Sequence, residues 1–356
     1  MSSSRPRLAI VGLLIVTLVA ACSSGGTTFS TSVGASALTS ASAAPSSGPS
    51  ATLTKLKVGL GYIPSVQFAQ FYLALQAGYY AQAGLDVELQ NKIDQDLIPL
   101  VGQGAIDVGI GDGTSIIPAV SQGIPVQYVA TIYGQLPNIV FAKASSGIKT
   151  AADLKGRRIG VPGRYGSGWI ALQILLGSAN LTTEDVQIVE YPDFTQRAAV
   201  AQGAVDAATG FANNEPVQLE LDGDPAVVLH IDAIIALPGP GLISGTGTLE
   251  TKHEAVAAFV AATLRAMKEI MADPKVGLDA AIKAVPELAS AREAQTAILA
   301  ATIATWKGPV QRQHGLGALD LAGWQASIPY FQSIGVIKKP VTVQDLVRTD
   351  VLPAGG

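Results

Sequence analysis

Four stretches of this sequence, at residues 61–65, 111–114, 162–167 and 210–215, combine glycine with short polar side chains, and three of them also carry an aromatic ring. Rings can stack on a flat ligand, while a few convergent carboxyl, amide and hydroxyl groups can bind its edge. We therefore predict a small-molecule pocket in and near these stretches. Its expected residues are Tyr62, Pro64, Ser65, Gln67, Asp112, Thr114, Tyr133, Asn138, Arg164, Tyr165, Ser167, Phe211, Asn213, Asn214 and Glu215.

Within this set the side-chain chemistry predicts roles. The rings expected to stack on the ligand are those of Tyr62, Tyr165 and Phe211. The groups expected to bind its polar edge are those of Asp112, Asn213 and Glu215. Two of them have an alternative role in local structure, since Asp112 could cap a helix near Thr114 and Glu215 could begin its own helix. Trp169 shares an apolar helix face with Leu172 and Leu176, which favours a place in the core.

The stretch at residues 163–168 has a second interpretation as an anion site. It is rich in glycine and precedes an expected helix, so its backbone N–H groups could bind phosphate or sulfonate. It has neither the lysine–serine pair of a P-loop nor the GxGxxG spacing, so nucleotide binding by those motifs is unsupported. Arg164 is its one cation and could equally be a solvated surface residue.

Groups that could perform catalysis are scattered along the chain. His230, His253 and His314 lie outside the four stretches, and Ser65 and Ser167 have no evident partnering base. The sequence contains no HExxH or GxSxG motif and no paired metal-ligand spacing. We therefore expect a binding protein and not an enzyme, with no cofactor and no metal.

An internal repeat indicates how these stretches are brought together. VGQGAIDVGIGDG at residues 101–113 returns as VAQGAVDAATGFA at residues 200–212, and KVGL at 57–60 matches RIGV at 158–161. A unit of about a hundred residues has the size of a small domain. We expect two similar Rossmann-like α/β lobes with a ligand cleft and a hinge between them, followed by C-terminal helices. Open sheets of this kind bind ligands beyond the carboxyl ends of their strands, where the four stretches fall.

The pattern of short β-branched runs alternating with helical periodicity predicts the elements of each lobe. In the first lobe, strands are expected at 56–60, 85–89, 106–110 and 126–130, and helices at 67–78, 97–102 and 114–122. In the second, strands are expected at 158–161, 187–191, 205–209 and 226–231, and helices at 168–177, 195–202 and 215–221. Residues 138–142 and 239–241 are the expected crossovers. Helices at 253–272, 276–284, 291–306 and 319–334 should pack mainly on the first lobe, which gives lobe bounds of 55–140 with 243–356, and 141–242.

The first 54 residues are expected to lie outside the fold. Residues 1–21 have a basic start and an apolar run, as a signal peptide does. Cys22, the single cysteine, ends the sequence LVAAC, which resembles a bacterial lipobox whose cysteine is lipidated. The following Ser-, Thr-, Ala- and Gly-rich segment to residue 54 is typical of a disordered tether. These features predict a monomeric extracytoplasmic protein held to the membrane by lipid. A net charge of −4 without a basic patch gives no indication of nucleic-acid binding.

Five segments in series resemble a known family. They are GYIPSVQFAQFYLALQAGYYAQAGLDVEL, DVGIGDG, GIKTAADLKGRRIGVPG, YGSGWIAL and GFANNEPVQL. Together they resemble the substrate-binding proteins of bacterial ABC importers, in the branch related to thiamine-pyrimidine synthases and to sulfonate- and nitrate-binding proteins. The resemblance implies a type II periplasmic-binding-protein fold that closes on its ligand about a hinge, with an ABC permease and its ATPase as partners.

Within that branch, the sequence around Tyr62 and at residues 213–216 is most similar to that of proteins that bind riboflavin or thiamine-precursor aminopyrimidines. Sulfonates, taurine or nitrate remain alternatives through residues 163–167. A pyrimidine-biosynthesis enzyme on the same scaffold is a further alternative. The synthases carry a cysteine-rich motif. This chain lacks that motif, because its single cysteine is Cys22, at the expected lipid anchor. A surface lipoprotein that binds no small molecule is the third.

Overall fold

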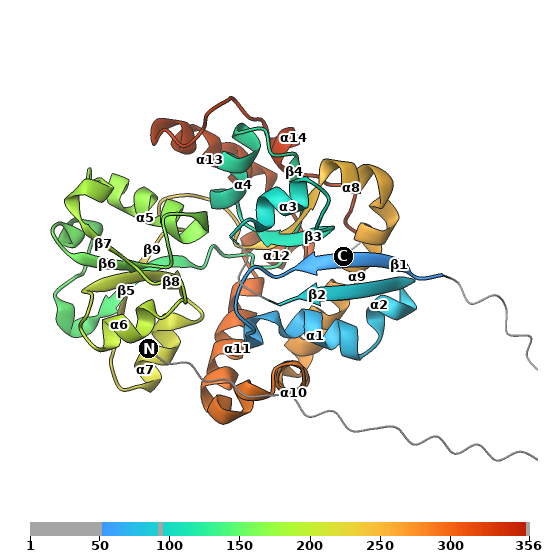
Figure 1. The fold of residues 1–356 in the computed structure, drawn as a ribbon, viewed down its shortest axis with the longest axis horizontal. Coiled ribbons are helices and arrows are strands. Elements are labelled where there is room, and N and C mark those ends of the chain that lie inside the picture. Colours follow the sequence, from blue (N-terminus) through green and yellow to red (C-terminus); the bar gives the residue numbers. More distant parts are fainter. Residues whose placement is uncertain (1–51, 92–94, 354–356) are drawn as a thin grey trace, which may run out of the picture. The chain divides into compact units, whose positions relative to one another are not determined.

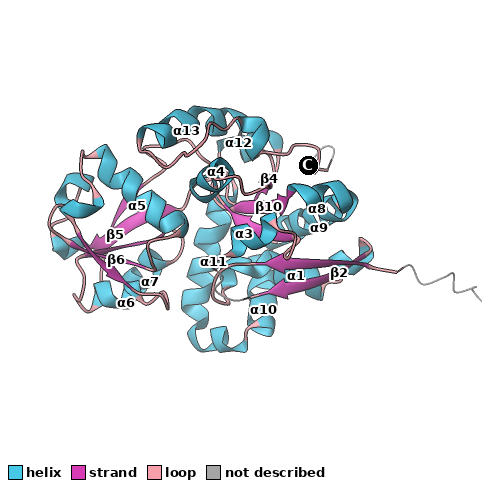
Figure 2. Ribbon diagram, turned by 45° about the horizontal axis from the view of Figure 1, so that its top comes forward, coloured by secondary structure: helices cyan, strands magenta, loops and turns pink. Residues whose placement is uncertain are grey.

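The computed structural model of the chain describes residues 52–91 and 95–353 (Figure 1). The expected signal peptide, Cys22 and the tether as far as residue 51 lie outside these residues. The described part forms two five-stranded sheets flanked by helices, which confirms the α/β class expected from the repeat (Figure 2). No helix within it is both long and apolar enough to cross a bilayer.

The first sheet has the strand order β2-β1-β3-β10-β4. Its strands are β1 (Thr54–Gly59), β2 (Leu85–Gln90), β3 (Val108–Gly111), β4 (Val126–Thr131) and β10 (Gly241–Gly245). β1 pairs in parallel with β2 and β3, whereas β10 runs antiparallel to β3 and β4. The helices between these strands are α1 (Ala69–Gln76), α2 (Tyr79–Gln82), α3 (Leu97–Gly102) and α4 (Gly113–Ser121), with the 3-10 turn η1 (Val66–Phe68) ahead of α1.

The second sheet repeats this arrangement in the order β7-β6-β8-β5-β9. Its strands are β5 (Asn138–Lys143), β6 (Arg158–Val161), β7 (Gln187–Glu190), β8 (Ala207–Phe211) and β9 (Ala226–His230). β6 is parallel to β7 and β8, and β5 is antiparallel to β8 and β9. Its helices are α5 (Gly166–Ser178), α6 (Gln196–Ala201) and α7 (Glu215–Leu221), and the short 3-10 turns η2 (Ala144–Ser146), η3 (Ala151–Leu154) and η4 (Thr183–Asp185) complete this part.

Matched aspartates show that the sequence repeat is also a structural one. Asp107 accepts a hydrogen bond from the backbone N–H of Lys57 at 2.8 Å, and Asp206 accepts one from Arg158 N–H at the same distance. Each carboxylate thereby ties the residue just ahead of a lobe's third strand to the first strand of that lobe. The third strands begin two residues later than expected in both lobes, at Val108 and at Ala207.

The segment expected as a crossover at residues 138–142 is instead the strand β5, and this expectation was wrong. Five of its six residues are buried, because an apolar run of this length is stable between two strand neighbours. The chain enters the second sheet through β5 and returns to the first through β10. Each of these strands runs antiparallel to both of its neighbours in its sheet. The expected lobe bounds at 140 and 242 fall inside these two strands.

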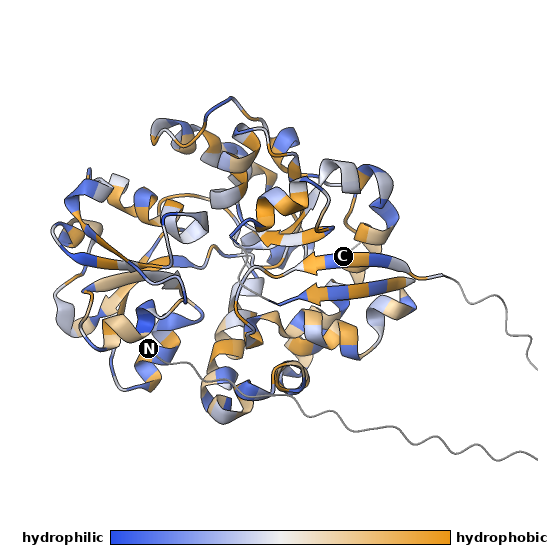
Figure 3. Ribbon diagram, in the orientation of Figure 1, coloured by the Kyte–Doolittle hydropathy of each residue, from blue (hydrophilic) through white to orange (hydrophobic). Residues whose placement is uncertain are grey.

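The C-terminal helices divide between two hydrophobic clusters. They are α8 (Thr246–Thr251), α9 (His253–Ala272), α10 (Pro274–Ala284), α11 (Arg292–Trp306), α12 (Pro309–His314), α13 (Leu321–Ser333) and α14 (Val343–Leu346), with the 3-10 turn η5 (Pro286–Ala291) before α11. α9 and α10 pack with α1 beside the first sheet, whereas α11 contacts η1 and α10 on that side and α7 of the second lobe. Figure 3 shows hydrophobic colour along the strands and on alternating parts of these helices.

α13 departs from the expectation that these helices pack on the first lobe. Its Trp324 lies edge-on to Tyr128 of β4, with ring centroids 5.1 Å apart. Its Tyr330 hydroxyl donates a hydrogen bond to the carbonyl of Ile174 in α5, at 3.0 Å. α13 therefore contacts elements of both sheets, because its buried face is wide enough to cover α4 and α5 together.

Candidate functional site

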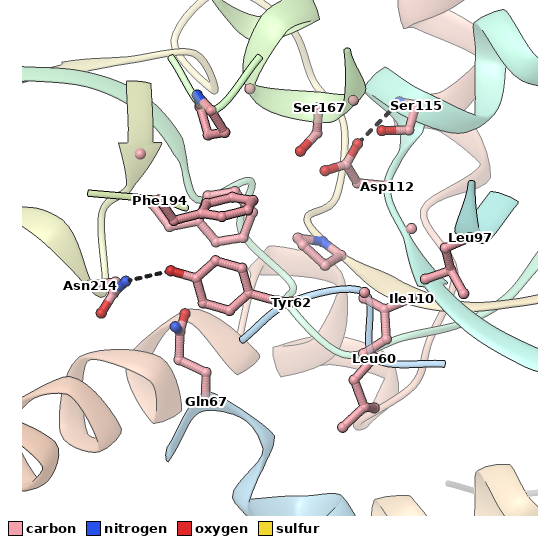
Figure 4. A pocket seen from close by; sticks show the side chains of 18 of the residues that line it. Leu60, Tyr62, Gln67, Leu97, Ile110, Asp112, Ser115, Ser167, Phe194 and Asn214 are labelled. Atoms are coloured by element: carbon pink, nitrogen blue, oxygen red, sulfur yellow. Dashed lines mark hydrogen bonds between the residues drawn. The ribbon is translucent and has the colours of Figure 1, made fainter. Parts of the chain in front are cut away.

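A cavity of about 250 Å³ is lined by residues from both sheets (Figure 4). Each strand that pairs in parallel with a neighbour contributes to it at or beyond its carboxyl end. Tyr62, Gln95 and Asp112 follow β1, β2 and β3, and Pro162, Phe194 and Phe211 follow or end β6, β7 and β8. Because parallel strands present their carboxyl ends at one edge, six loops distant in sequence meet at one site.

The cavity brings together nine of the fifteen residues expected at a pocket. These are Tyr62, Gln67, Asp112, Tyr133, Tyr165, Ser167, Phe211, Asn214 and Glu215. The six that do not line it are Pro64, Ser65, Thr114, Asn138, Arg164 and Asn213. Each of the four stretches contributes residues to the lining, whereas the direction of individual side chains within them was not evident from the sequence.

Two of the six residues outside the lining serve local structure, and a third is exposed. Ser65 caps η1 by accepting a hydrogen bond from the backbone N–H of Gln67 at 3.3 Å. Thr114 is fully buried and donates its hydroxyl to Asp112. Pro64 is exposed beside the cavity.

The other three residues outside the lining have different surroundings. Arg164 forms an ion pair with Glu190 at 3.0 Å and lies over the ring of Trp169, 5.4 Å from its centroid. Asn213 donates hydrogen bonds to the side chains of Gln67 and Thr302. Asn138 is buried in β5, and neither atom of its amide has a hydrogen-bond partner among the described residues; we have no physical account of this.

Aromatic rings form one wall of the cavity. Tyr62 lies edge-on to Phe194, with centroids 4.9 Å apart and an interplanar angle of 89°, and edge-on to Phe68 at 6.5 Å (Figure 4). Phe194 was missed in the sequence, although it follows a second strand just as Tyr62 follows a first. Its φ of 60° lies in the left-handed region, which is unusual for a bulky residue. The second strands of each lobe also end at the shared edge, and this was the signal that could have found it.

The carboxyl groups of Asp112 and Glu215 are the acidic groups of the described lining. Asp112 is the N-cap of α4 and accepts a hydrogen bond from Ser115 N–H at 3.2 Å, and Figure 4 shows Ser167 next to it. Glu215 begins α7 and accepts a hydrogen bond from Phe211 N–H at 2.8 Å. Burial raises the pKa of each carboxyl above its ordinary value, against the lowering effect of these hydrogen bonds. Both residues therefore line the cavity and support its walls at the same time.

The charge of the described lining is acidic or neutral. It includes no lysine, arginine, histidine or cysteine. His230 and His253 lie outside it, 3.8 Å from Asp232 and 3.5 Å from Asp350. Within the described part of the chain, no group of three or more metal-ligating side chains could hold a metal ion. The arrangement suits a neutral molecule with a flat apolar body and a few polar groups.

Comparison with known proteins places the fold and the site in context. Residues 65–276 match the family described as NMT1/THI5 like. The chain is 31% identical to the riboflavin-binding protein RibY of Chloroflexus aurantiacus, over 98% of both chains. It is 26% identical to the formylaminopyrimidine-binding protein of Halalkalibacterium halodurans, over 82% of this chain and 89% of the relative.

An enzyme and a solved structure complete the comparison. The 4-amino-5-hydroxymethyl-2-methylpyrimidine phosphate synthase of Legionella pneumophila is 28% identical over 46% of this chain and 52% of its own. The alkanesulfonate-binding protein SsuA of Xanthomonas axonopodis pv. citri, bound to MOPS, superposes with a TM-score of 0.64 at 19% identity, covering 84% of this chain and 98% of SsuA. The last similarity shows the shared fold alone.

Proposed function

The chain belongs to the NMT1/THI5-like family, and we propose that it is the extracytoplasmic solute-binding lipoprotein of an ABC importer. It captures a small heteroaromatic nutrient, riboflavin-like or a thiamine-precursor pyrimidine, and presents it to a permease with its ATPase. The observation that carries this proposal is the cavity in which Tyr62 and Phe194 form an aromatic wall and Asn214 and Glu215 add polar groups. The relatives named for riboflavin and formylaminopyrimidine binding support the same ligand class.

Capture proceeds by closure of one lobe on the other about the two crossovers, which are residues 132–137 between β4 and β5 and residues 231–240 between β9 and β10. These segments lie side by side, because Tyr133 N–H donates to the carbonyl of Pro240 at 2.9 Å and Gly239 N–H donates to the carbonyl of Tyr133 at 2.8 Å. Two paired connections can bend together while each sheet stays rigid. The ring system of the ligand packs against Tyr62 and Phe194, and closure removes it from water.

Two other functions fit the site less well. A sulfonate or nitrate ion could use the N-terminus of α5, since Gly166, Ser167 and Gly168 line the cavity. The buried carboxyl groups of Asp112 and Glu215 oppose an anion there, and the described lining offers no cation to offset them. Pyrimidine synthesis is favoured by the Legionella relative, but the described lining has no lysine, histidine or cysteine to perform it.

Absorbance and calorimetry on the purified protein test this proposal. We expect a flavin or an aminopyrimidine to co-purify, or to bind with saturation at one molecule per chain. Taurine and nitrate should produce no heat of binding under the same conditions. Binding of taurine or nitrate alone would replace this ligand assignment with the anion alternative, and turnover of a bound pyrimidine would replace it with the enzyme.

A further inference from the structure

Gln70 on α1 has an amide group that the protein itself leaves unpaired. Its side chain is 1% exposed and lines the cavity, and neither Oε1 nor Nε2 has a hydrogen-bond partner among the described residues. Gln67, three residues earlier, differs in this respect. Its Nε2 donates to Ser65 at 3.2 Å and its Oε1 accepts from Asn213 at 2.8 Å.

A buried amide without partners is unfavourable, and folded proteins seldom keep one unless another molecule pairs with it. A carboxamide presents one acceptor and one donor side by side in a plane. It therefore pairs best, through two hydrogen bonds, with a group that also presents an adjacent donor and acceptor. Asparagine and glutamine bind the edge of adenine in this way.

Other unpaired side chains do not offer the same pair of groups. Gln196 also lines the cavity, but its Nε2 already donates to the carbonyl of Thr209 at 3.3 Å, so only its Oε1 remains free. The Thr209 hydroxyl is a single group that is also without a partner. The amide of Asn138 is wholly unpaired but lies outside the lining. Gln70 alone among the described lining residues combines an unpaired donor and an unpaired acceptor on one amide.

We propose that Gln70 determines specificity at this site by pairing, through two hydrogen bonds, with an adjacent donor and acceptor on the edge of a flat ring. This inference rests on the proposed function and narrows its ligand class. Two sources present such an edge. A flavin ring carries an imide, in which an N–H lies beside a carbonyl. An aminopyrimidine carries an amino group beside a ring nitrogen.

The test compares ligands with and without this edge on matched variants. Riboflavin and riboflavin methylated at its imide nitrogen are titrated by calorimetry into the full chain and into Gln70→Met, which has nearly the same length without an amide. The wild type should bind riboflavin about tenfold or more tightly than the methylated form, since one partner of a buried pair is removed. Gln70→Met should bind both with nearly equal affinity.

Gln76→Met is the matched control, because Gln76 lies on the same helix but outside the cavity lining, where its amide donates to the carbonyl of Ala280. It should keep the wild-type preference. Gln70→Met should also unfold at the same temperature as the wild type or higher, because an unpaired buried amide is replaced by an apolar group. A clear loss of stability would show that Gln70 is structural and would overturn the inference. If Gln70→Met does not fold, Gln70→Leu, which also lacks both the donor and the acceptor, should likewise lose the preference.

The outcomes separate the inference from the proposed function. If the wild type binds riboflavin but Gln70→Met keeps the same preference, the role of Gln70 is refuted and the proposed function stands. If flavins do not bind, the same comparison is made between a 4-aminopyrimidine and its dimethylamino form. A preference that disappears in Gln70→Met then supports the inference with the pyrimidine as source. Failure of both ligands to bind the wild type overturns the inference together with the proposed function.

Discussion

The side-chain amide of Asn213 donates a hydrogen bond to Gln67 Oε1 at 2.8 Å, although 146 residues separate the two in sequence. It donates a second hydrogen bond to the hydroxyl of Thr302 at 2.9 Å. Asn213 follows β8 of the second sheet, whereas Gln67 lies in η1 beside the first sheet and Thr302 lies in α11. Asn213 therefore joins the two sides of the site and does not line the cavity itself.

These hydrogen bonds predict that Asn213→Ala lowers the affinity for every ligand by the same factor. Loss of two buried hydrogen bonds that hold the lobes together should reduce affinity about tenfold, without changing the preference among ligands. Calorimetry with riboflavin and two ring analogues measures both quantities. Thr302→Val, which removes one of the two acceptors, should act in the same direction with a smaller effect. A change in ligand preference in Asn213→Ala would indicate direct contact with the ligand.

The edge-on pair of Tyr62 and Phe194 predicts coupled effects on binding. Phe194→Ala and Tyr62→Ala should each reduce affinity by about 1–2 kcal/mol, since each removes a ring face from the cavity. Because the two rings are in contact, the double variant should lose less than the sum of the single losses. Quenching of ligand fluorescence or calorimetry measures all three affinities. Phe194→Leu, which keeps apolar volume, should be intermediate, and strictly additive losses would argue against a shared ring wall.

Burial raises the pKa of Asp112, and this predicts a pH-dependent difference in stability. The folded protein then holds this proton more tightly than the unfolded chain does. The contribution of Asp112 to stability is thus fully present below the unfolded pKa of about 4 and is lost as pH rises through the raised folded pKa. Asp112→Asn can still accept the hydrogen bond from Ser115 N–H and does not titrate.

Urea unfolding of both proteins at several pH values measures this difference. The free energy of unfolding of Asp112→Asn, relative to wild type, should increase from about pH 4 to about pH 8. Parallel pH profiles of the two proteins would contradict the assignment. Thr114→Val removes a hydrogen bond that lowers the pKa of the same carboxyl group, so the pH dependence of its stability should be larger than that of the wild type.

Close approach of the two crossovers predicts that Gly239→Ala is destabilising. A β-carbon at Gly239 would lie 2.4 Å from the carbonyl oxygen of Gln135 and 2.7 Å from Cβ of Tyr133. Backbone must move to admit it, and we expect a loss of about 1–3 kcal/mol in the free energy of unfolding. Gly247→Ala in α8 is the matched control, since nothing lies within 4 Å of its β-carbon. That change should stabilise by about 0.5–1 kcal/mol, because alanine favours a helix over glycine. Equal changes in the free energy of unfolding for the two variants would show that the crossovers can move apart without loss of stability.

The lone cysteine predicts the attachment of the protein to the membrane. In cells that process lipoproteins, Cys22→Ser should abolish lipid labelling and move the protein from the membrane fraction to the soluble fraction. Its ligand affinity should remain unchanged, because Cys22 lies outside the described fold. Membrane retention of the serine variant would indicate a different anchor.

Much of this architecture was predictable from the sequence, because it depends on patterns among residues that are close together in the chain. The strands and helices follow from β-branched runs and helical periodicity, and the doubled sequence indicated two similar sheets. The rule that ligands bind beyond the carboxyl ends of parallel strands then led to loops that line the cavity. A capping role for Asp112 was one of the two roles expected from the sequence, since a cap and its helix are adjacent in the chain.

The sequence by itself therefore determined the α/β class, the repeat and the loops that meet at the cavity. Only the tertiary structure decided that the chain passes between the sheets through β5 and β10. It also decided that Asn213 bonds to Gln67, and that Gln70 and Phe194 line the cavity. The physical reason is that the direction of a side chain at a site depends on packing between distant segments. No periodicity within a single loop carries that information.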